Sequence, residues 1–431
     1  IVPFNELDYP DFTASVEAFE RLKAKTPKIH PVPIRYYDID VITSDYLINN
    51  IDNAFRACAL NRVGNLSFDD FCEYILPYRA SIEPLQSWRE HYAQRYAWID
   101  DSIRSNPSKS PVSYFSNEIT TNFVNIWGKE TRKEPLPRLG AMQLIFRKKG
   151  FCEDVADLSV FAMRSLGFPA SVDFVPFWAT SSGSHFLNST LDDQKRRVAF
   201  EAYWGGTIWD GSVKPKKFVR EPSKVIRSTY SKQPGVLAGL EKQENIPDGF
   251  LRTYNYQDVT SEYWETNDLT CGLFAANPIP RIAYLCVLNY QMWQPTWWGR
   301  VAKDSVTFTN MPKGVVYLPV YYINSRIVPA GYPVAQGYNH QQVLSPDTVH
   351  TRIVKIAKQD KYLKIRPNSI YTLSYWDNQW KVIGIKMSDE NTHELTFDKV
   401  PSNALLILIP NYSERKERPF IITDEGERVW F

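Results

Sequence analysis

The sequence predicts a multi-domain α+β protein. Its 431 residues are enough for two to four domains of roughly 100–200 residues each. Apolar residues recur at helical spacing over about the first 110 residues, helical and strand patterns mix up to about residue 250, and short β-branched and aromatic runs follow. We therefore expect a helical N-terminal region, an α+β core and C-terminal β-sandwich modules.

The composition is that of an ordinary globular protein. Hydrophobic residues make up 43% and charged residues 23% of the chain, which excludes wholesale disorder. The 50 Lys and Arg residues nearly balance the 48 Asp and Glu residues, leaving a net charge of +2. A chain with that balance has no strong positive electrostatic field to attract a polyanion, so we expect no nucleic-acid partner. No apolar run approaches about 18 residues, so we expect no transmembrane segment.

We expect residues 1–111 to form the helical region. Apolar side chains recur at helical spacing in three stretches, 11–25, 44–60 and 66–80. Cys58 and Cys72 fall on or beside these apolar faces, where we expect them to pack as core thiols rather than act as ligands or nucleophiles.

The mixed core is expected over residues 112–250. The patterns predict two helices, at 113–127 and 150–170, and two strands, at 171–178 and 196–204. The segment 214–235 carries a local excess of basic residues, and we interpret it as a solvated connector.

Two β-sandwich modules are expected beyond the core, at 251–346 and 347–431. Strand-like runs occur at 281–290, 305–310, 314–323, 371–376, 380–387 and 404–410. Asp377 and Asn378 stand between two of these runs and predict a hairpin turn. Residues 292–300 contain Trp293, Trp297 and Trp298, which either fill the module's core or form a surface patch that binds glycans.

Cys152 is the cysteine with a chemical context. It follows Gly150-Phe151 at the start of a predicted helix, whose free N–H groups favour a thiolate and can hold an oxyanion. The alternative is a small hydrophobic residue at a helix start. None of the five cysteines lies in a CxxC or in a Cys/His cluster with zinc-like spacing, so we predict no metal and no other cofactor.

Two further residues are candidates for activating this thiol. His185 begins a predicted strand soon after the Cys-headed helix, and Glu201 lies in the next strand. An imidazole can take the proton of a thiol and later return it, and a carboxylate can orient the ring. If the two strands form a hairpin, His185 and Glu201 lie opposite each other. Asp193, in the polar turn between the strands, is the alternative third member.

The sequence resembles the transglutaminase-like superfamily, with its papain-like Cys-His-Asp/Glu core. Four successive segments carry the resemblance: GFCEDVADLSVFAMRSLGFPA, DFVPFW, SHFLN and VAFEAYW. The resemblance implies that Cys152 is the nucleophile, His185 the general base and acid, and Glu201 the orienting acid. The three-part layout is also similar to that of large bacterial extracytoplasmic members of this superfamily.

The resemblance implies cysteine-dependent acyl transfer or hydrolysis of a peptide or amide bond through a thioester at Cys152. The partner would then be a peptide, protein or glycoprotein substrate. The family usually has Asp where this chain has Glu201, so the alternative is a catalytically degenerate protein that binds glycan or protein at the cell surface. Gln143 is a candidate oxyanion donor and Trp178 a candidate wall of the acyl site, although helix-surface and core-packing roles also explain them.

Localisation is expected outside the cytoplasm, in the periplasm or at the cell surface. The expectation rests on the family resemblance and on the first residue, Ile1, which indicates either a removed N-terminal segment or a trimmed start.

Overall fold

The computed structural model describes residues 12–26, 28, 36–64, 66–125, 138–203, 207–209, 220–357, 365–413 and 417–431. The chain divides into two compact units. The first unit comprises Ile1–Phe174, Phe186–Ser212 and Arg227–Ser231, and the second comprises Val175–His185, Val213–Ile226 and Lys232–Phe431. The second unit thus takes in both predicted β modules, and also the segment that leads to His185.

The first unit carries all described α-helices of more than four residues, together with the four-residue α2. They are α1 (Phe12–Lys25), α2 (Asp38–Val41), α3 (Ser44–Cys58), α4 (Phe68–Tyr74), α5 (Arg89–Ser105), α6 (Pro111–Asn122), α7 (Ala141–Arg147) and α8 (Cys152–Ser165). Side-chain caps fix two of the predicted starts, since Thr43 accepts a hydrogen bond from the backbone N–H of Tyr46 and Ser67 one from that of Asp70. The helix predicted over 113–127 ends earlier, at Asn122.

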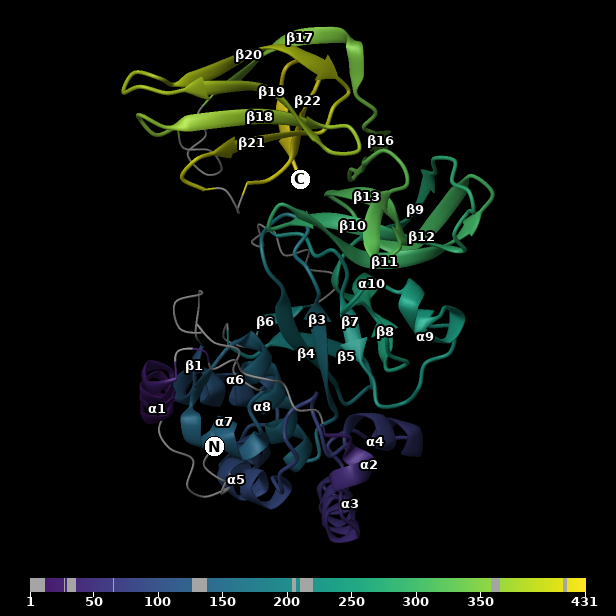
Figure 1. Ribbon diagram of the computed structural model, residues 1–431. Helices are drawn as coiled ribbons and strands as arrows, with labels where there is room; N and C mark the ends of the chain where they lie inside the picture. Colours follow the sequence, from purple (N-terminus) through teal and green to yellow (C-terminus); the bar gives the residue numbers. More distant parts are fainter. Residues whose placement is uncertain are drawn as a thin grey trace. The chain divides into compact units, whose positions relative to one another are not determined.

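Helix α8 is the centre of the first unit's core (Figure 1). Its residues from Asp154 to Ser165 are all buried. The ring of Phe161 packs between two aromatic residues of the α5 region, with centroids 4.8 Å from Trp88 and 5.6 Å from Tyr92. Near the C-terminal end, the fully buried guanidinium of Arg164 donates to the carbonyls of Tyr74, Arg79 and Ala170. A helix buried on all sides can therefore hold its first residue in a fixed place.

Five strands beside α8 follow the order β6-β5-β4-β3-β7. They are β3 (Ala170–Val175), β4 (His185–Leu191), β5 (Arg197–Glu201), β6 (Thr207–Trp209) and β7 (Ile226–Ser228). The predicted hairpin is confirmed, because β4 and β5 pair antiparallel with Asn188 opposite Phe200. The carboxamide of Asn188 donates to the carbonyls of Ala156 and Ser171, which ties β4 to α8 and β3. A two-stranded parallel pair, β1 (Val124–Asn125) and β2 (Lys149–Gly150), precedes α8.

The interpretation of the basic segment 214–235 as a solvated connector is wrong for its described part. Lys224 and Arg227 are buried, at 0% and 1% exposure. The Lys224 ammonium donates to Asp258 at 2.6 Å and to the carbonyl of Thr309 at 2.8 Å. The Arg227 guanidinium makes two hydrogen bonds to Asp173, at 2.8 and 2.7 Å. Burial is tolerated because each charge meets an opposite charge and further acceptors.

The second unit is mainly antiparallel sheet. Its short helices are α9 (Leu237–Leu240) and α10 (Thr260–Tyr263), and strand β8 (Tyr256–Asp258) lies between them. The first module contains β9 (Thr266–Gly272), β10 (Ile282–Asn289), β11 (Met292–Ala302), β12 (Ser305–Pro312), β13 (Val315–Ile323), β14 (Arg326–Pro329), β15 (Val334–Gln336) and β16 (Gln341–Val343). These strands follow the path β16-β15-β13-β10-β11-β12-β9, with β14 attached to β13.

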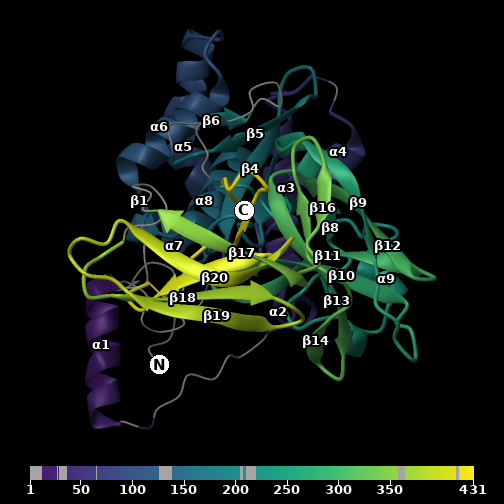
Figure 2. The same ribbon diagram turned by 90° about the horizontal axis from the view of Figure 1, so that it is seen from above.

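The second module has two sheets around one apolar core. The sheets are β17 (Asp347–Ala357) with β20 (Glu394–Ser402), and β19 (Trp380–Met387), β18 (Ile370–Trp376), β21 (Leu406–Pro410), β22 (Phe420–Ile422) and β23 (Arg428–Trp430). Both sheets contribute side chains to that core, among them Leu373, Phe397 and Leu406. Figure 2 shows β17 and β20 beside β18 and β19. The predicted turn at Asp377-Asn378 is confirmed, since Trp376 pairs with Trp380.

The tryptophans of residues 292–300 pack inside the second unit. Trp297 is 7% exposed, and its ring lies 4.1 Å from the ammonium of Lys224. Trp293 meets Trp376 of the second module edge to face, with centroids 5.3 Å apart. These contacts favour the core-packing alternative for both residues. Across the described part of the chain, no helix is both long and apolar enough to cross a membrane.

Candidate active site

Cys152 is the first residue of α8, as the sequence predicts. Just before it, the backbone N–H of Phe151 donates to Asp154 Oδ2 at 2.8 Å, so the carboxylate folds back over the helix start. That arrangement requires Gly150, because a Cβ there would lie 2.5 Å from Asp154 Oδ2 and 2.6 Å from Asp154 Cβ. The Gly-Phe-Cys sequence thus fixes the position of the Cys152 side chain at the start of α8.

Asp154 is a buried carboxylate in the first turn of α8, two residues after Cys152. Burial raises its pKa to about 6, against the hydrogen bond from Phe151, which lowers it, and the charge of Glu153 adds to the rise. Its second oxygen, Oδ1, is buried without a hydrogen-bond partner among the described residues. The first turn of α8 therefore holds a carboxyl group that titrates in the mildly acidic range.

Cys152 and Glu201 line the same small pocket of the first unit. Glu201 is the last residue of β5 and is 5% exposed, whereas Cys152 is partly exposed. The other lining residues come from α8, from β1, from the start of β4 and from the residues after β5: Asn125, Val155, Ala156, Phe186, Leu187, Asn188, Ala202 and Tyr203. The structure thus brings together two of the three residues that the sequence singled out.

His185 is the first residue of β4 but groups with the second unit. Its approach to Cys152 therefore stays a prediction. The register of the hairpin corrects the expected pairing with Glu201. Because Asn188 lies opposite Phe200, continuation of that register puts Leu187 opposite Glu201, and His185 comes two residues earlier on the same face of the strand. Glu201 would thus have to reach His185 diagonally.

Trp178, the predicted wall of the acyl site, lies against the histidine. Its ring is stacked on that of His185 with centroids 5.8 Å apart and 28° between the planes. Trp178 is 5% exposed and, like His185, belongs to the second unit. A stacked indole restricts the rotation of an imidazole.

The two remaining sequence candidates lie outside the pocket. Asp193 is exposed in the turn that follows β4, and a strand of seven residues separates it from His185 by roughly 20 Å, too far for it to orient the ring. Gln143 is buried in α7, where its Oε1 accepts a hydrogen bond from the backbone N–H of Gly140 at 2.6 Å. This helix cap accounts for Gln143, and its role toward an oxyanion stays a prediction.

Sequence reasoning missed Asn125. This buried residue of β1 lies opposite Gly150 in the parallel pair and is one of the residues that line the pocket of Cys152. A carboxamide there adds a hydrogen-bond donor to those of the helix start. No sequence signal identifies it, because a strand of two residues has no periodicity.

A buried ion pair between Arg138 and Asp157 holds the first turns of α8. Arg138 Nε donates to Asp157 at 2.9 Å, and Arg138 also pairs with Glu153 at 3.2 Å. Its guanidinium lies 5.3 Å from the ring centroid of Phe186, which lines the Cys152 pocket. These charges fix α8 in place and do not line the pocket.

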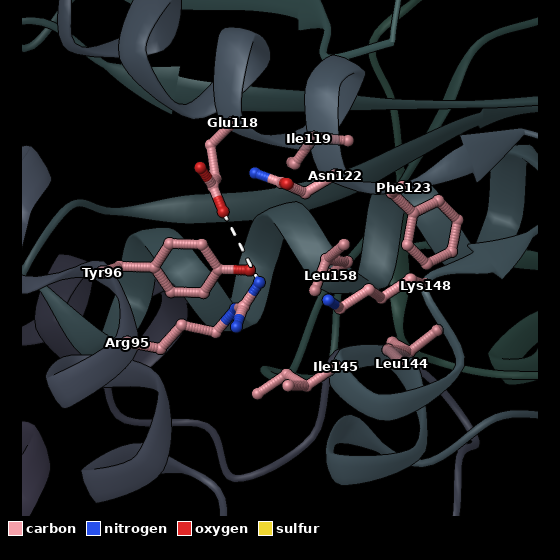
Figure 3. Close-up of a pocket in the computed structure, with 10 residues that line it drawn as sticks. All are labelled: Arg95, Tyr96, Glu118, Ile119, Asn122, Phe123, Leu144, Ile145, Lys148 and Leu158. Carbon is pink, nitrogen blue, oxygen red and sulfur yellow. Dashed lines mark ion pairs between the residues drawn. The ribbon is translucent and has the colours of Figure 1, made fainter.

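A second pocket of the first unit contains none of the predicted site residues. Figure 3 shows it between α5, α6 and α7, with Leu158 of α8 among its lining residues. Arg95 and Glu118, two of its lining residues, form an ion pair 3.6 Å apart. We assign it no role.

All five cysteines are free. Cys58 and Cys72 are half-buried beside the small apolar cluster of Ala54, Phe71 and Ile75, and burial raises the pKa of each thiol. Within the described ranges, no group of three His, Cys, Asp or Glu side chains is arranged to hold a metal ion.

One comparison with known proteins covers the part of the chain that contains Cys152 and Glu201. The model of the transglutaminase-like superfamily matches residues 102–202. A search of curated protein sequences gives no match. Among solved structures, the chain is similar to red sea bream transglutaminase at 11% identity and a TM-score of 0.26, over 84% of this chain and 70% of that one, a likeness too weak to carry an argument. From the family match, which includes both Cys152 and Glu201, we conclude that the chain contains a core of the transglutaminase-like superfamily.

Proposed function

We propose that this protein is a cysteine hydrolase that cleaves a peptide or amide bond through a thioester on Cys152. The observation that carries the proposal is the pocket shared by Cys152, at the head of α8, and Glu201, at the end of β5. A thiol at a helix N-terminus and a buried carboxylate close by are two of the parts that acyl transfer by cysteine requires.

His185 supplies the proton transfer in this proposal. It takes the proton of the Cys152 thiol as the sulfur attacks the carbonyl carbon, and the carbonyl oxygen becomes an oxyanion. When the oxyanion collapses, the C–N bond breaks and the proton passes from His185 to the leaving amine. Water then attacks the thioester, again losing a proton to His185, and the thiol leaves with that proton as the acid product is released.

The oxyanion is stabilised by two groups in the proposal. The N-terminal N–H groups of α8 carry a partial positive charge, and Asn125, which lines the same pocket, supplies its carboxamide as a second donor. Glu201 orients the imidazole, reaching it diagonally along the hairpin. Trp178 keeps the imidazole ring from turning through the stacking described above.

Hydrolysis is proposed rather than amine transfer because the likeness covers only the common core at residues 102–202. The substrate is proposed to be a peptide, protein or glycoprotein, and its location the periplasm or cell surface, as the resemblance implies. Detection of the protein solely in the cytoplasmic fraction of its own cells would contradict the proposed location.

The proposed chemistry can be tested without the natural substrate. p-Nitrophenyl acetate acylates activated cysteines, so incubation with this ester followed by peptide mapping should find the acetyl group on Cys152. Cys152→Ala should abolish that adduct, and His185→Ala should slow its formation and hydrolysis. Hydrolysis of an amide is then assayed with a pooled library of fluorogenic peptide amides.

The same experiment decides against the alternative of a degenerate binding protein. Acetyl groups distributed over Cys58, Cys72 and Cys152 at similar rates would contradict the proposal, since the first two are half-buried thiols without a described catalytic context. Amide hydrolysis that persists in Cys152→Ala would contradict it as well.

A further inference from the structure

The segment between β3 and β4 is held by one residue of the β module, Asn289. Its Nδ2 lies 2.9 Å from the carbonyl oxygen of Trp178 and 3.1 Å from those of Ser181 and Gly183. Its Oδ1 accepts a hydrogen bond from the backbone N–H of Gly183 at 3.2 Å. Asn289 is 2% exposed. One buried carboxamide thus uses both its donor and its acceptor on three residues of the segment that ends at His185.

Asn289 itself stands on a rigid support. It is the last residue of β10 and pairs with Met292 of β11 across a two-residue turn. Both turn residues, Tyr290 and Gln291, have positive φ, of 50° and 61°, as tight hairpin turns require. The carboxamide is therefore presented from the end of a ladder that continues through the sheet.

The held segment forms a closed loop. The Trp178 N–H donates to the Gly183 carbonyl at 2.9 Å, and Gly183 has φ +91°, a conformation that favours glycine. On its other side, the Ala179 N–H donates to the carbonyl of Glu221 at 2.9 Å. Trp178, whose carbonyl Asn289 binds, is the residue that stacks on His185. A displacement of the loop therefore reaches the imidazole by two routes, through the chain and through the indole.

We propose that Asn289 is a positioning residue for the acyl-transfer reaction, fixing the loop of residues 176–184 so that Trp178 and His185 keep their places. This inference rests on the proposed function of Cys152. It assigns the first β module a part in the chemistry, because the residue that holds the histidine-bearing loop comes from β10.

The experiment compares Asn289→Ala and Asn289→Asp with Asn403→Gly in the full chain. Aspartate fits the space but offers no donor to three carbonyls, and its charge repels them. Asn403 is a matched control, because its carboxamide also donates to two backbone carbonyls, those of Val343 and Ser345. Its φ of 51° suits glycine, so that substitution removes the carboxamide without backbone strain.

Two measurements are made on each variant. Hydrogen exchange of the Trp178 and Gly183 amides reports whether the loop is still held, and kcat and KM are measured with the best peptide amide of the library. Both Asn289 variants should exchange these amides faster and lose kcat by about 10- to 100-fold with KM changed less than about threefold, as misplacement of a catalytic group does. Asn403→Gly should match the wild type in both measurements.

Unchanged exchange at Trp178 and Gly183 in both Asn289 variants would overturn the anchoring role, whatever the activity. Faster exchange with unchanged kcat would overturn the positioning role. Equal losses in Asn289→Asp and in Asn403→Gly would show a general effect on stability and would also overturn it. Failure of the proposed function itself is recognised separately, by activity that survives Cys152→Ala.

Discussion

Trp178 and His185 stack ring on ring, with centroids 5.8 Å apart and 28° between their planes. An imidazole that transfers protons must keep one orientation. We therefore predict that loss of the Trp178 indole lowers kcat and leaves KM nearly unchanged. Trp178→Phe keeps an aromatic face and should retain most activity. Trp178→Leu should lower kcat by about tenfold or more with little change in KM. Steady-state kinetics with circular dichroism as a folding control measures this, and equal activity of the two variants would contradict it.

Asp154 should make the stability of the first unit depend on pH. Burial raises its folded pKa to about 6 from an ordinary value of 3.8, so the folded state keeps a proton that the unfolded state releases. The contribution of this group to the free energy of unfolding is thus present below about pH 4 and is lost as the pH rises through about 6. It amounts to at most about 3 kcal/mol. Asp154→Asn still accepts the Phe151 N–H but cannot ionise.

The measurement is urea unfolding of the wild type and Asp154→Asn between pH 4 and pH 8. The variant should gain stability relative to the wild type as the pH rises, and the gain should level off above about pH 7. A difference between the two proteins that is constant across this range, or that shrinks as the pH rises, would show that the carboxyl group is not perturbed in the direction stated.

Gly150 should be intolerant of a side chain for a steric reason. A Cβ there would lie 2.5 Å from Asp154 Oδ2, so Gly150→Ala must displace the carboxylate that accepts the Phe151 N–H. We expect a loss of roughly 1–3 kcal/mol in the free energy of unfolding and slower alkylation of Cys152. Gly64→Ala is the matched control, since an added Cβ there meets nothing within 4 Å. Similar stability of the two variants in urea unfolding would refute the prediction.

Asn125 should stabilise the transition state more than it binds substrate. Asn125 is one of the residues that line the pocket of Cys152, and loss of one oxyanion donor typically lowers kcat by about 100- to 1000-fold. We expect that range for Asn125→Ala with KM nearly unchanged. Asn122→Ala, an exposed change three residues earlier at the end of α6, is the control. A rise in KM with kcat intact would instead assign Asn125 to substrate binding.

The local part of the site could be predicted from the sequence. Cys152 comes two residues after Gly150 and heads a segment that Gly150 bounds at its start and Gly167 and Pro169 bound at its end, which are local signals of a helix. Glu201 was found because it follows in the next strand of a hairpin with alternating residues. The sequence pattern places Glu201 opposite His185, two residues away from the observed register. The turn around Asp192 and Lys195 sets that register, and it is polar throughout and gives no length signal.

The non-local part could not be predicted. In the sequence, Lys224 and Arg227 look like solvated charges. They are buried because each pairs with a carboxylate that is distant along the chain: Lys224 with Asp258, 34 residues away, and Arg227 with Asp173, 54 residues away. Asn289 belongs to a β module and lies more than a hundred residues from the loop that it holds. Charge and amide partners of this kind are set by the tertiary fold, which a periodic pattern does not encode.

The pH dependence of Cys152 alkylation by iodoacetamide tests the central claim most directly. All five thiols are free, so peptide mapping follows Cys152 beside Cys58 and Cys72 in one sample. Cys58 ends its helix and Cys72 lies within one, so neither has the N–H groups of a helix start. We predict that Cys152 reacts at least about tenfold faster at pH 6.5–7, and that His185→Ala removes most of this advantage. Equal rates for the three thiols, or a Cys152 rate that His185→Ala leaves unchanged, would contradict an activated nucleophile.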